Sequence, residues 1–104
     1  MNAPALWLLL AVFTSSTAHA QSFNCNFAKT PDEVLICQDS ALSELDERMA
    51  TAYARVRNTI APPERQVLES EQAAWLRMRQ QCGRDGGCIA NSYNQRIREL
   101  QAYQ

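Results

Sequence analysis

The chain has 104 residues, and its ten basic and eleven acidic side chains give a net charge of −1 near neutral pH. Nucleic-acid-binding domains are normally clearly basic, so this balance argues against that class of function. The one histidine, His19, lies among the first twenty residues, and all the charged side chains follow them.

The first twenty residues have the pattern of a secretory signal peptide. An apolar run at 5–13 is followed by small and polar residues and ends at Ala18-His19-Ala20, an A-x-A cleavage site. A membrane span needs about 20 apolar residues, and this run is less than half that length. We therefore expect residues 1–20 to be removed. Residues 21–104 would then form one small periplasmic or secreted domain.

Removal of this segment would take away the only histidine. Catalysis by Ser-His or Cys-His pairs, and metal sites built on histidine, would then be excluded. We accordingly expect no catalytic residues, no metal and no cofactor. No small-residue lipobox precedes Cys25, so we also expect no membrane anchor after cleavage.

Four cysteines lie in the expected exported part, Cys25, Cys37, Cys82 and Cys88. An even number in so small an exported domain predicts two disulfides, because the core alone supplies little net stability. The spacings match none of the common zinc patterns. We favour the local pairs Cys25–Cys37 and Cys82–Cys88. The pairs Cys25–Cys88 and Cys37–Cys82 remain an alternative, because an antiparallel hairpin would bring those ends together.

The first helix is predicted to begin at Thr30-Pro31-Asp32-Glu33. Thr30 can cap it, Pro31 suits the first helical position, and Glu33 completes a capping box. A second capping signal at Gln38-Asp39-Ser40 follows soon after. We therefore expect a short helix and then a long one.

Two long helices should form an antiparallel hairpin. The first carries apolar residues at alternating steps of three and four, namely Leu42, Leu45, Met49, Ala52 and Val56. Asn58 is expected to end it in a left-handed conformation, and Pro62 and Pro63 prevent it from continuing. The second helix is expected from Pro63 to Gly83, folded back after a short turn.

The second long helix places polar side chains on a stripe that should be buried. The stripe consists of Leu68, Gln72, Trp75, Arg79 and Cys82, at helical spacing. A buried amide or guanidinium must find partners, because burying it unpaired costs several kcal/mol. Acidic partners are therefore expected elsewhere in the chain.

Residues 84–87 are predicted to form a tight, glycine-rich connection. A third helix then carries apolar residues at steps of three and four: Ile89, Tyr93, Ile97, Leu100 and Tyr103. The predicted fold is all-α, with a short first helix, an antiparallel helical hairpin, a third helix packed across it, and two disulfides.

A set of spaced residues in this sequence resembles the LprI-type lysozyme inhibitor family. These residues are Phe23, Cys25, Ala28, Thr30, Glu33, Ile36, Cys37, Leu42, Leu45, Asp46, Tyr53, Gln72, Trp75, Leu76, Arg79, Cys82, Cys88, Tyr93, Arg96 and Leu100. The chain is similar to the small N-terminal domain of that family over essentially all of residues 21–104. The resemblance implies an exported, cysteine-bridged helical domain of bacteria that inhibits lysozyme.

Charged residues on several predicted helices could meet inside the bundle. They could form a site for acid–base chemistry, but a buried network that fixes the helix register is the stronger interpretation, because a small hairpin has little room for a cleft. We assign this structural network to Glu33, Asp46, Gln72, Trp75, Arg79 and Arg96.

Arg84 and Asp85 are the candidate residues for binding a partner. They lie in the predicted tight turn, where a charge contributes little to folding and is free to contact another molecule. The expected partner is a lysozyme whose cleft the turn would enter. The alternative is a non-inhibitory interaction or envelope-maintenance module, in which a helix face binds another exported protein.

Overall fold

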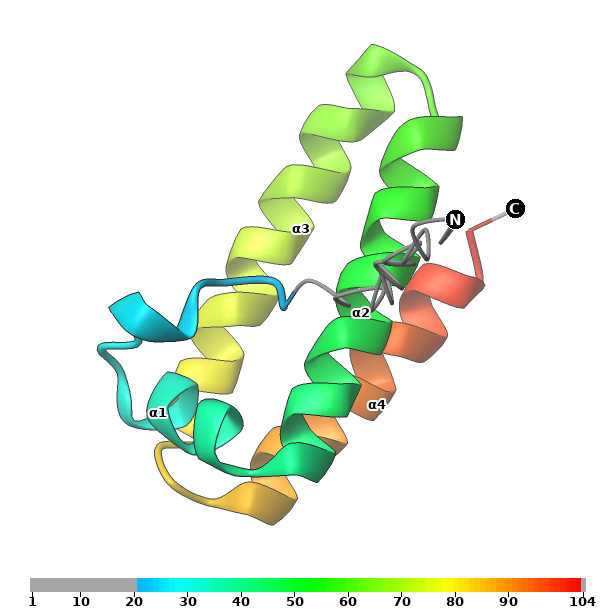
Figure 1. Ribbon diagram of the computed structural model, residues 1–104. Helices are drawn as coiled ribbons and strands as arrows, with labels where there is room; N and C mark the ends of the chain where they lie inside the picture. The colour runs from blue at the N-terminus through cyan, green and yellow to red at the C-terminus, as the bar shows by residue number, and fades with distance from the viewer. Residues whose placement is uncertain (1–20, 104) are drawn as a thin grey trace, which may run out of the picture.

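The computed structural model describes residues 21–103, and in this part helices are joined by short irregular segments, with no strand (Figure 1). A short 3-10 helix, η1, is followed by four α-helices: η1 Cys25–Phe27, α1 Pro31–Gln38, α2 Ser40–Thr59, α3 Pro62–Gln81 and α4 Gly86–Gln101. The all-α prediction is confirmed. The predicted signal peptide lies outside the described residues. Among the helices described, none is long and apolar enough to cross a membrane.

The helices form a hairpin whose open end is closed by other parts of the chain. The arms α2 and α3 diverge from their shared turn (Figure 1). The last long helix, α4, packs most extensively on α2 and also contacts α3. At the open end, α1 packs against both arms. The predicted third helix, which is α4, therefore packs against both arms of the hairpin.

Side-chain caps explain where three of the helices begin. The carboxylate of Glu33 accepts hydrogen bonds from the backbone N–H and the hydroxyl of Thr30, which precedes α1. The side chain of Asp39 accepts from the N–H of Leu42 and starts α2. The side chain of Asp85 does the same for α4. These bonds satisfy backbone donors that the first turn of a helix leaves free.

Two helix ends differ from the prediction. Asn58 is helical, and α2 continues to Thr59 and ends at the extended Ile60, because the prolines that follow exclude a further turn. In the described chain no residue except Gly83 has a positive φ, so the expected left-handed Asn58 was wrong. The second arm begins at Pro62, one residue earlier than expected.

The connection between α3 and α4 lies two residues earlier than predicted. Gly83, with φ of 58°, ends α3, as the sequence indicated. Gly86 and Gly87 belong to the first turn of α4, because Asp85 already caps that helix. The irregular segment therefore comprises residues 82–85 in place of the predicted 84–87.

The core lies along the lines where the long helices meet. Its buried apolar residues include most of the apolar positions that the helical spacing predicted: Ile36, Leu42, Met49, Ala52, Val56, Leu68, Trp75, Ile89, Tyr93, Ile97 and Leu100. Leu45 packs against this core from a partly buried position. Tyr103 lies beyond the end of α4 and is 37% exposed, so its predicted place in the α4 stripe was wrong.

Both disulfides are local. Cys25 is bonded to Cys37 and ties η1 to α1, and Cys82 is bonded to Cys88 across the α3–α4 turn. The favoured pairing is confirmed and the alternative is excluded. Each bond therefore constrains a short loop at the open end of the hairpin.

Candidate functional site

The guanidinium of Arg79 lies at the centre of a buried polar network. It is 3% exposed. Its Nε donates to Oδ2 of Asp32 at 2.8 Å, and its Nη1 donates to the Tyr93 hydroxyl at 3.0 Å. The same Nη1 lies 3.9 Å from Oδ1 of Asp46. One side chain of α3 therefore reaches α1, α2 and α4.

Tyr93 and Asp46 extend this network to the N-terminal segment. The Tyr93 hydroxyl donates to Oδ1 of Asp46 at 2.8 Å. Asp46 also accepts from the backbone N–H of Ser22 at 2.7 Å and from its hydroxyl. Both Tyr93 and Asp46 are fully buried. The network consequently fixes the segment that precedes η1 as well as the helices.

Three aromatic rings surround Arg79. The centroids of Phe23, Trp75 and Tyr93 lie 5.5, 5.6 and 5.7 Å from its guanidinium carbon. Cation–π attraction is stronger where water is excluded, so these rings help to compensate for the burial of the charge. The indole N–H of Trp75 donates to the carbonyl of Ser92 at 3.0 Å, which also holds α3 against α4.

The network shifts the pKa values of Asp32 and Tyr93. Burial alone would raise the pKa of Asp32, but the Thr30 hydroxyl and the Arg79 guanidinium outweigh it and hold the pKa below its ordinary value. Burial raises the pKa of Tyr93 above that of a free phenol, and Asp46 adds to this while Arg79 opposes it. Asp32 is therefore favoured as a carboxylate and Tyr93 as a neutral phenol.

Gln72 and Arg96 form a second, smaller group of polar contacts. Nε of Arg96 donates to Oε1 of Gln72 at 2.8 Å, and Nε2 of Gln72 donates to Sδ of Met49 at 3.1 Å. Arg96 also donates to the partly exposed Glu99 at 3.0 Å. This group joins α3 to α4 and α2 beside the Arg79 network.

Glu33, which the sequence analysis assigned to the network, is hydrogen-bonded to Thr30 at the start of α1. Burial alone would raise the pKa of Glu33, but the bonds from Thr30 hold it below the ordinary value. The acid that meets Arg79 is the preceding residue, Asp32. The sequence contained one usable signal, because Asp32 is acidic and lies in the same helical turn.

The network is suited to holding helices together. Its two carboxylates and its tyrosine hydroxyl are buried, and each takes part in hydrogen bonds within the network. No group of three His, Cys, Asp or Glu side chains within residues 21–103 is arranged to hold a metal ion. Two exposed surfaces lie outside this network, the α3–α4 turn and a groove between α2 and α4.

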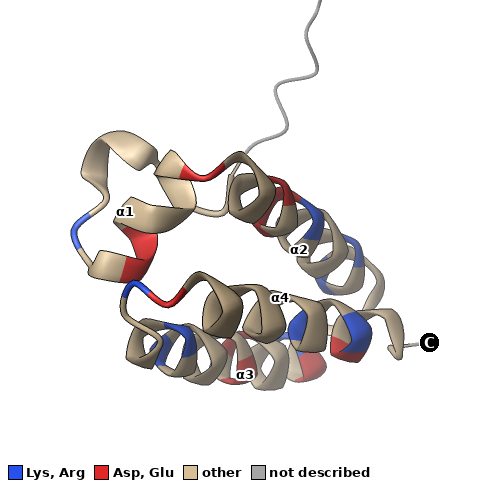
Figure 2. Cartoon of the chain, turned by 90° about the horizontal axis from the view of Figure 1, so that it is seen from below, with Lys and Arg blue, Asp and Glu red and all other residues tan. Residues whose placement is uncertain are grey.

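The α3–α4 turn presents Arg84 and Asp85 to solvent. Both side chains are exposed, and Figure 2 shows charges of both signs at this turn, next to α1. Asp85 already forms hydrogen bonds within the turn. Its carboxylate accepts from the N–H of Cys88 at 3.1 Å, and its own N–H donates to the carbonyl of Cys82. Arg84 forms no ion pair with any described residue. It is therefore the side chain of the turn that is free to bind.

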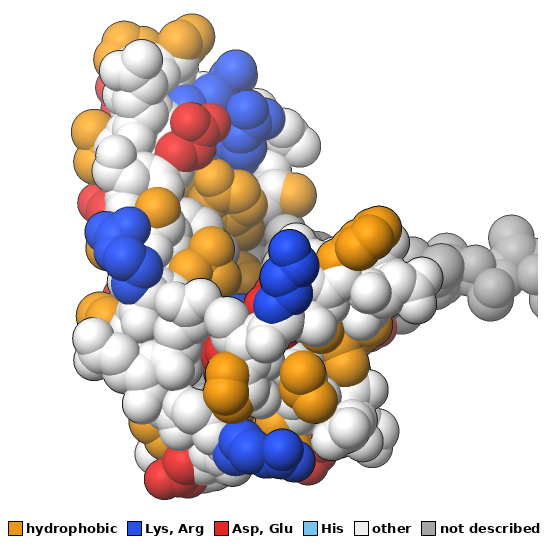
Figure 3. Space-filling view, turned by 90° about the vertical axis from the view of Figure 1, so that its left-hand side faces the viewer, with side chains coloured by type: hydrophobic (Ala, Val, Ile, Leu, Met, Phe, Trp, Pro, Cys, Tyr) orange, Lys and Arg blue, Asp and Glu red, His pale blue; other side chains and the backbone are white. Residues whose placement is uncertain are grey.

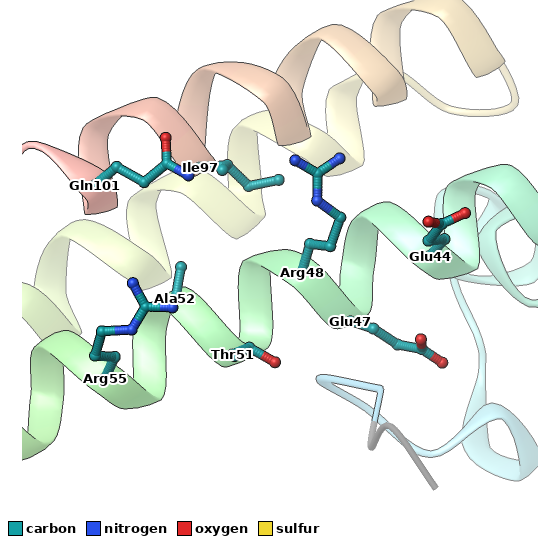
Figure 4. A pocket seen from close by; sticks show the side chains of 8 residues that line it. All are labelled: Glu44, Glu47, Arg48, Thr51, Ala52, Arg55, Ile97 and Gln101. Carbon is teal, nitrogen blue, oxygen red and sulfur yellow. The ribbon is translucent and has the colours of Figure 1, made fainter. Parts of the chain in front are cut away.

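A groove of about 490 Å³ runs between α2 and α4. Figure 4 shows Arg48 and Arg55 extending from α2, with Ala52 between them and Ile97 on the facing helix α4. Neither arginine forms an ion pair with a described residue. They are seven residues apart, about 10 Å along the helix axis. The groove thus offers two cations, and the carboxylates of Glu44 and Glu47 also line it.

The sequence was compared with protein families, curated proteins and solved structures. The family described as lysozyme inhibitor LprI matches residues 25–100. The proteins named Lipoprotein LprI from Mycobacterium bovis and Mycobacterium tuberculosis are each 31% identical to this chain over 90 residues. The match covers 84% of this chain and 44% of each relative, so the chain spans less than half of their length. No solved structure matches. The chain belongs to the LprI lysozyme inhibitor family.

Proposed function

We propose that this chain is an exported lysozyme inhibitor that acts by stoichiometric binding, without turnover. Family membership supports lysozyme as the partner, and the two disulfides support an oxidising compartment. The observation that carries the mechanism is the exposed Arg84 on a turn that the Cys82–Cys88 disulfide closes.

This turn has the properties of an inhibitory loop. The disulfide, the cap by Asp85 and the left-handed Gly83 hold it in one conformation, so binding would order few additional groups. Lysozyme cleaves glycosidic bonds with a pair of carboxyl groups. A guanidinium can donate two parallel hydrogen bonds to such a carboxylate. Arg84 would therefore enter the cleft and pair with the catalytic acids.

The direct test is an inhibition assay with the protein in its natural form. The chain, expressed with its own leader and purified oxidised from the periplasm, should inhibit at least one of the chicken-type, goose-type or invertebrate-type lysozymes. Titration at enzyme concentrations above the dissociation constant should reach full inhibition at one inhibitor per enzyme. If none of the three is inhibited, the proposal is wrong.

The proposed location is the periplasm or the cell exterior, in soluble form. The mycobacterial relatives are named lipoproteins, and they are about twice as long as this chain. In this sequence no small-residue lipobox precedes Cys25, and Cys25 is consumed in a disulfide. The purified product should begin at Gln21 and carry no lipid, which intact-mass spectrometry measures.

The α2–α4 groove favours a second candidate function. Arg48 and Arg55 could bind two acidic side chains of another exported protein without any role for the turn. In that case Arg48→Ala combined with Arg55→Ala would abolish the interaction and Arg84→Ala would not. The two proposals therefore predict opposite sensitivities.

A further inference from the structure

A pocket of about 290 Å³ lies between the diverging arms of the hairpin. Its walls come from α2, α3 and the N-terminal segment, and they are mainly apolar: Phe23, Met49, Tyr53 and Leu76. Figure 3 shows hydrophobic side chains gathered in a hollow of the surface on this side of the molecule. The α3–α4 turn does not line this pocket.

The polar side chains around the pocket are mostly committed to other partners. The Ser22 hydroxyl donates to Asp46, and Glu33 accepts from Thr30. Gln72 is bonded to both Arg96 and Met49. A sugar carries many hydroxyl groups, and few of them would find a hydrogen-bond partner here. Removing those hydroxyls from water without new hydrogen bonds costs free energy. The lining therefore favours an apolar occupant.

Arg79 supplies one free polar contact. It lines the pocket, and its Nε and Nη1 are bonded to Asp32 and Tyr93. Its Nη2 makes no hydrogen bond to a described residue, and this atom is not fully buried. This nitrogen is thus open to a small polar group at the pocket.

The local charge decides which polar group fits. Arg79 stands between Asp32 and Asp46, and Glu33 lies at the same pocket, so negative charges outnumber positive ones. A carboxylate or phosphate would be repelled, whereas a neutral carbonyl oxygen can accept from Arg79 at no electrostatic cost. A peptide backbone next to a large apolar side chain presents this combination.

We propose that this pocket anchors a large apolar side chain of a protein partner, with a neighbouring backbone carbonyl accepting a hydrogen bond from Arg79. Such pockets, filled by aromatic or aliphatic anchors, carry much of the binding energy of many protein interfaces. The identification of the partner as lysozyme rests on the proposed function. The chemistry of the pocket does not depend on it.

The test uses a minimal occupant of defined chemistry. The isotope-labelled, oxidised protein is titrated with N-acetyl-L-tryptophanamide and followed by amide NMR. Saturable shifts are expected at Ala50, Tyr53 and Leu76. The anionic N-acetyl-L-tryptophan should bind at least threefold more weakly, because of the surrounding carboxylates.

A pocket-filling variant and a matched control make the test specific. Ala50 is half-buried on the pocket wall, and Ala50→Leu fills part of the volume without removing a contact. Affinity for the amide should fall at least tenfold. Ala54→Leu, the same change at an exposed site on α2 that does not line this pocket, should leave affinity unchanged. Melting curves of both variants confirm that they fold.

The possible results separate this inference from the proposed function. Absence of saturable shifts, or an unaffected Ala50→Leu variant, overturns the pocket. Shifts of the same amides by an N-acetylglucosamine trimer, without binding of the tryptophan amide, would assign the site to carbohydrate and overturn it too. Amide binding by a chain that inhibits no lysozyme would support the pocket and refute the proposed function. If lysozyme is inhibited equally by Ala50→Leu, lysozyme is not the occupant.

Discussion

Arg79 donates a hydrogen bond to Asp32 at 2.8 Å although the two residues are 47 positions apart, and neither is more than 3% exposed. The contact joins the last turns of α3 to the first turn of α1. It closes the open end of the hairpin from inside, whereas each disulfide constrains one short loop at that end.

The first prediction concerns the buried ion pair. Arg79→Ala should lower the free energy of unfolding by about 2 to 4 kcal/mol, because it leaves Asp32 buried without its counter-charge. Arg77→Ala, on the exposed face of the same helix, should change it by less than about 0.5 kcal/mol. Urea unfolding followed by circular dichroism gives both values. An Arg79→Ala protein as stable as the wild type would contradict the network.

The second prediction is a loss of stability in acid. The pKa of Asp32 is lower in the folded protein than in the unfolded chain, so its contribution is complete above the unfolded value of about 4. It is lost as the pH falls from there through the folded value. The Asp32→Asn variant should be less stable than the wild type at pH 7. Its free energy of unfolding, measured by urea unfolding, should decrease less between pH 5 and pH 2. If the stability of the two proteins changes with pH in the same way, Asp32 is not responsible for the loss of stability in acid.

The third prediction concerns alkaline pH. The pKa of Tyr93 is raised, so its contribution to stability is present below about pH 10, the ordinary tyrosine value, and falls as the pH rises above it. Tyr93→Phe should show a smaller decline between pH 9 and pH 11. The change also removes the hydrogen bonds to Asp46 and Arg79, which should cost about 1 to 3 kcal/mol at pH 7. An equally steep alkaline decline in the variant would count against this role.

The fourth prediction separates the two disulfides. Each closes a short loop, with sequence separations of 12 and 6, and each should stabilise the protein by about 2 to 3 kcal/mol. Replacing Cys25 and Cys37 by alanine should lower the free energy of unfolding slightly more than replacing Cys82 and Cys88, because the first disulfide closes the longer loop. Urea unfolding measures both. Only the second replacement should also weaken lysozyme inhibition, since it frees the turn. Equal inhibition by both variants would show that a rigid turn is not required.

The fifth prediction tests Arg84 itself. Arg84→Ala should weaken inhibition by tenfold or more, a loss of at least about 1.4 kcal/mol, with no change in melting temperature. Inhibition should also weaken as salt is raised, because the contact is between opposite charges. Arg77→Ala removes the same charge from a site away from the turn and serves as the control. If both variants lose inhibition to the same extent, net charge and not the turn is responsible.

Local sequence patterns determined much of this protein. The capping residues, the prolines and the spacing of apolar positions predicted the helices and their order, because each depends on neighbours within one or two turns. The favoured disulfides were predictable for the same reason, since each spans few residues. Gly83 was also predictable, because a left-handed helix end favours glycine.

The tertiary structure decided which polar residues meet. The sequence indicated that Arg79 needs an acidic partner, but Asp32 and Glu33 are adjacent acids in one turn, and their directions around α1 separate their roles. Tyr93 gave no sign of lying between Arg79 and Asp46. The pocket between α2 and α3 exists because the hairpin arms diverge to admit α4 and the N-terminal segment. That angle is set by packing among distant residues, which no local pattern records.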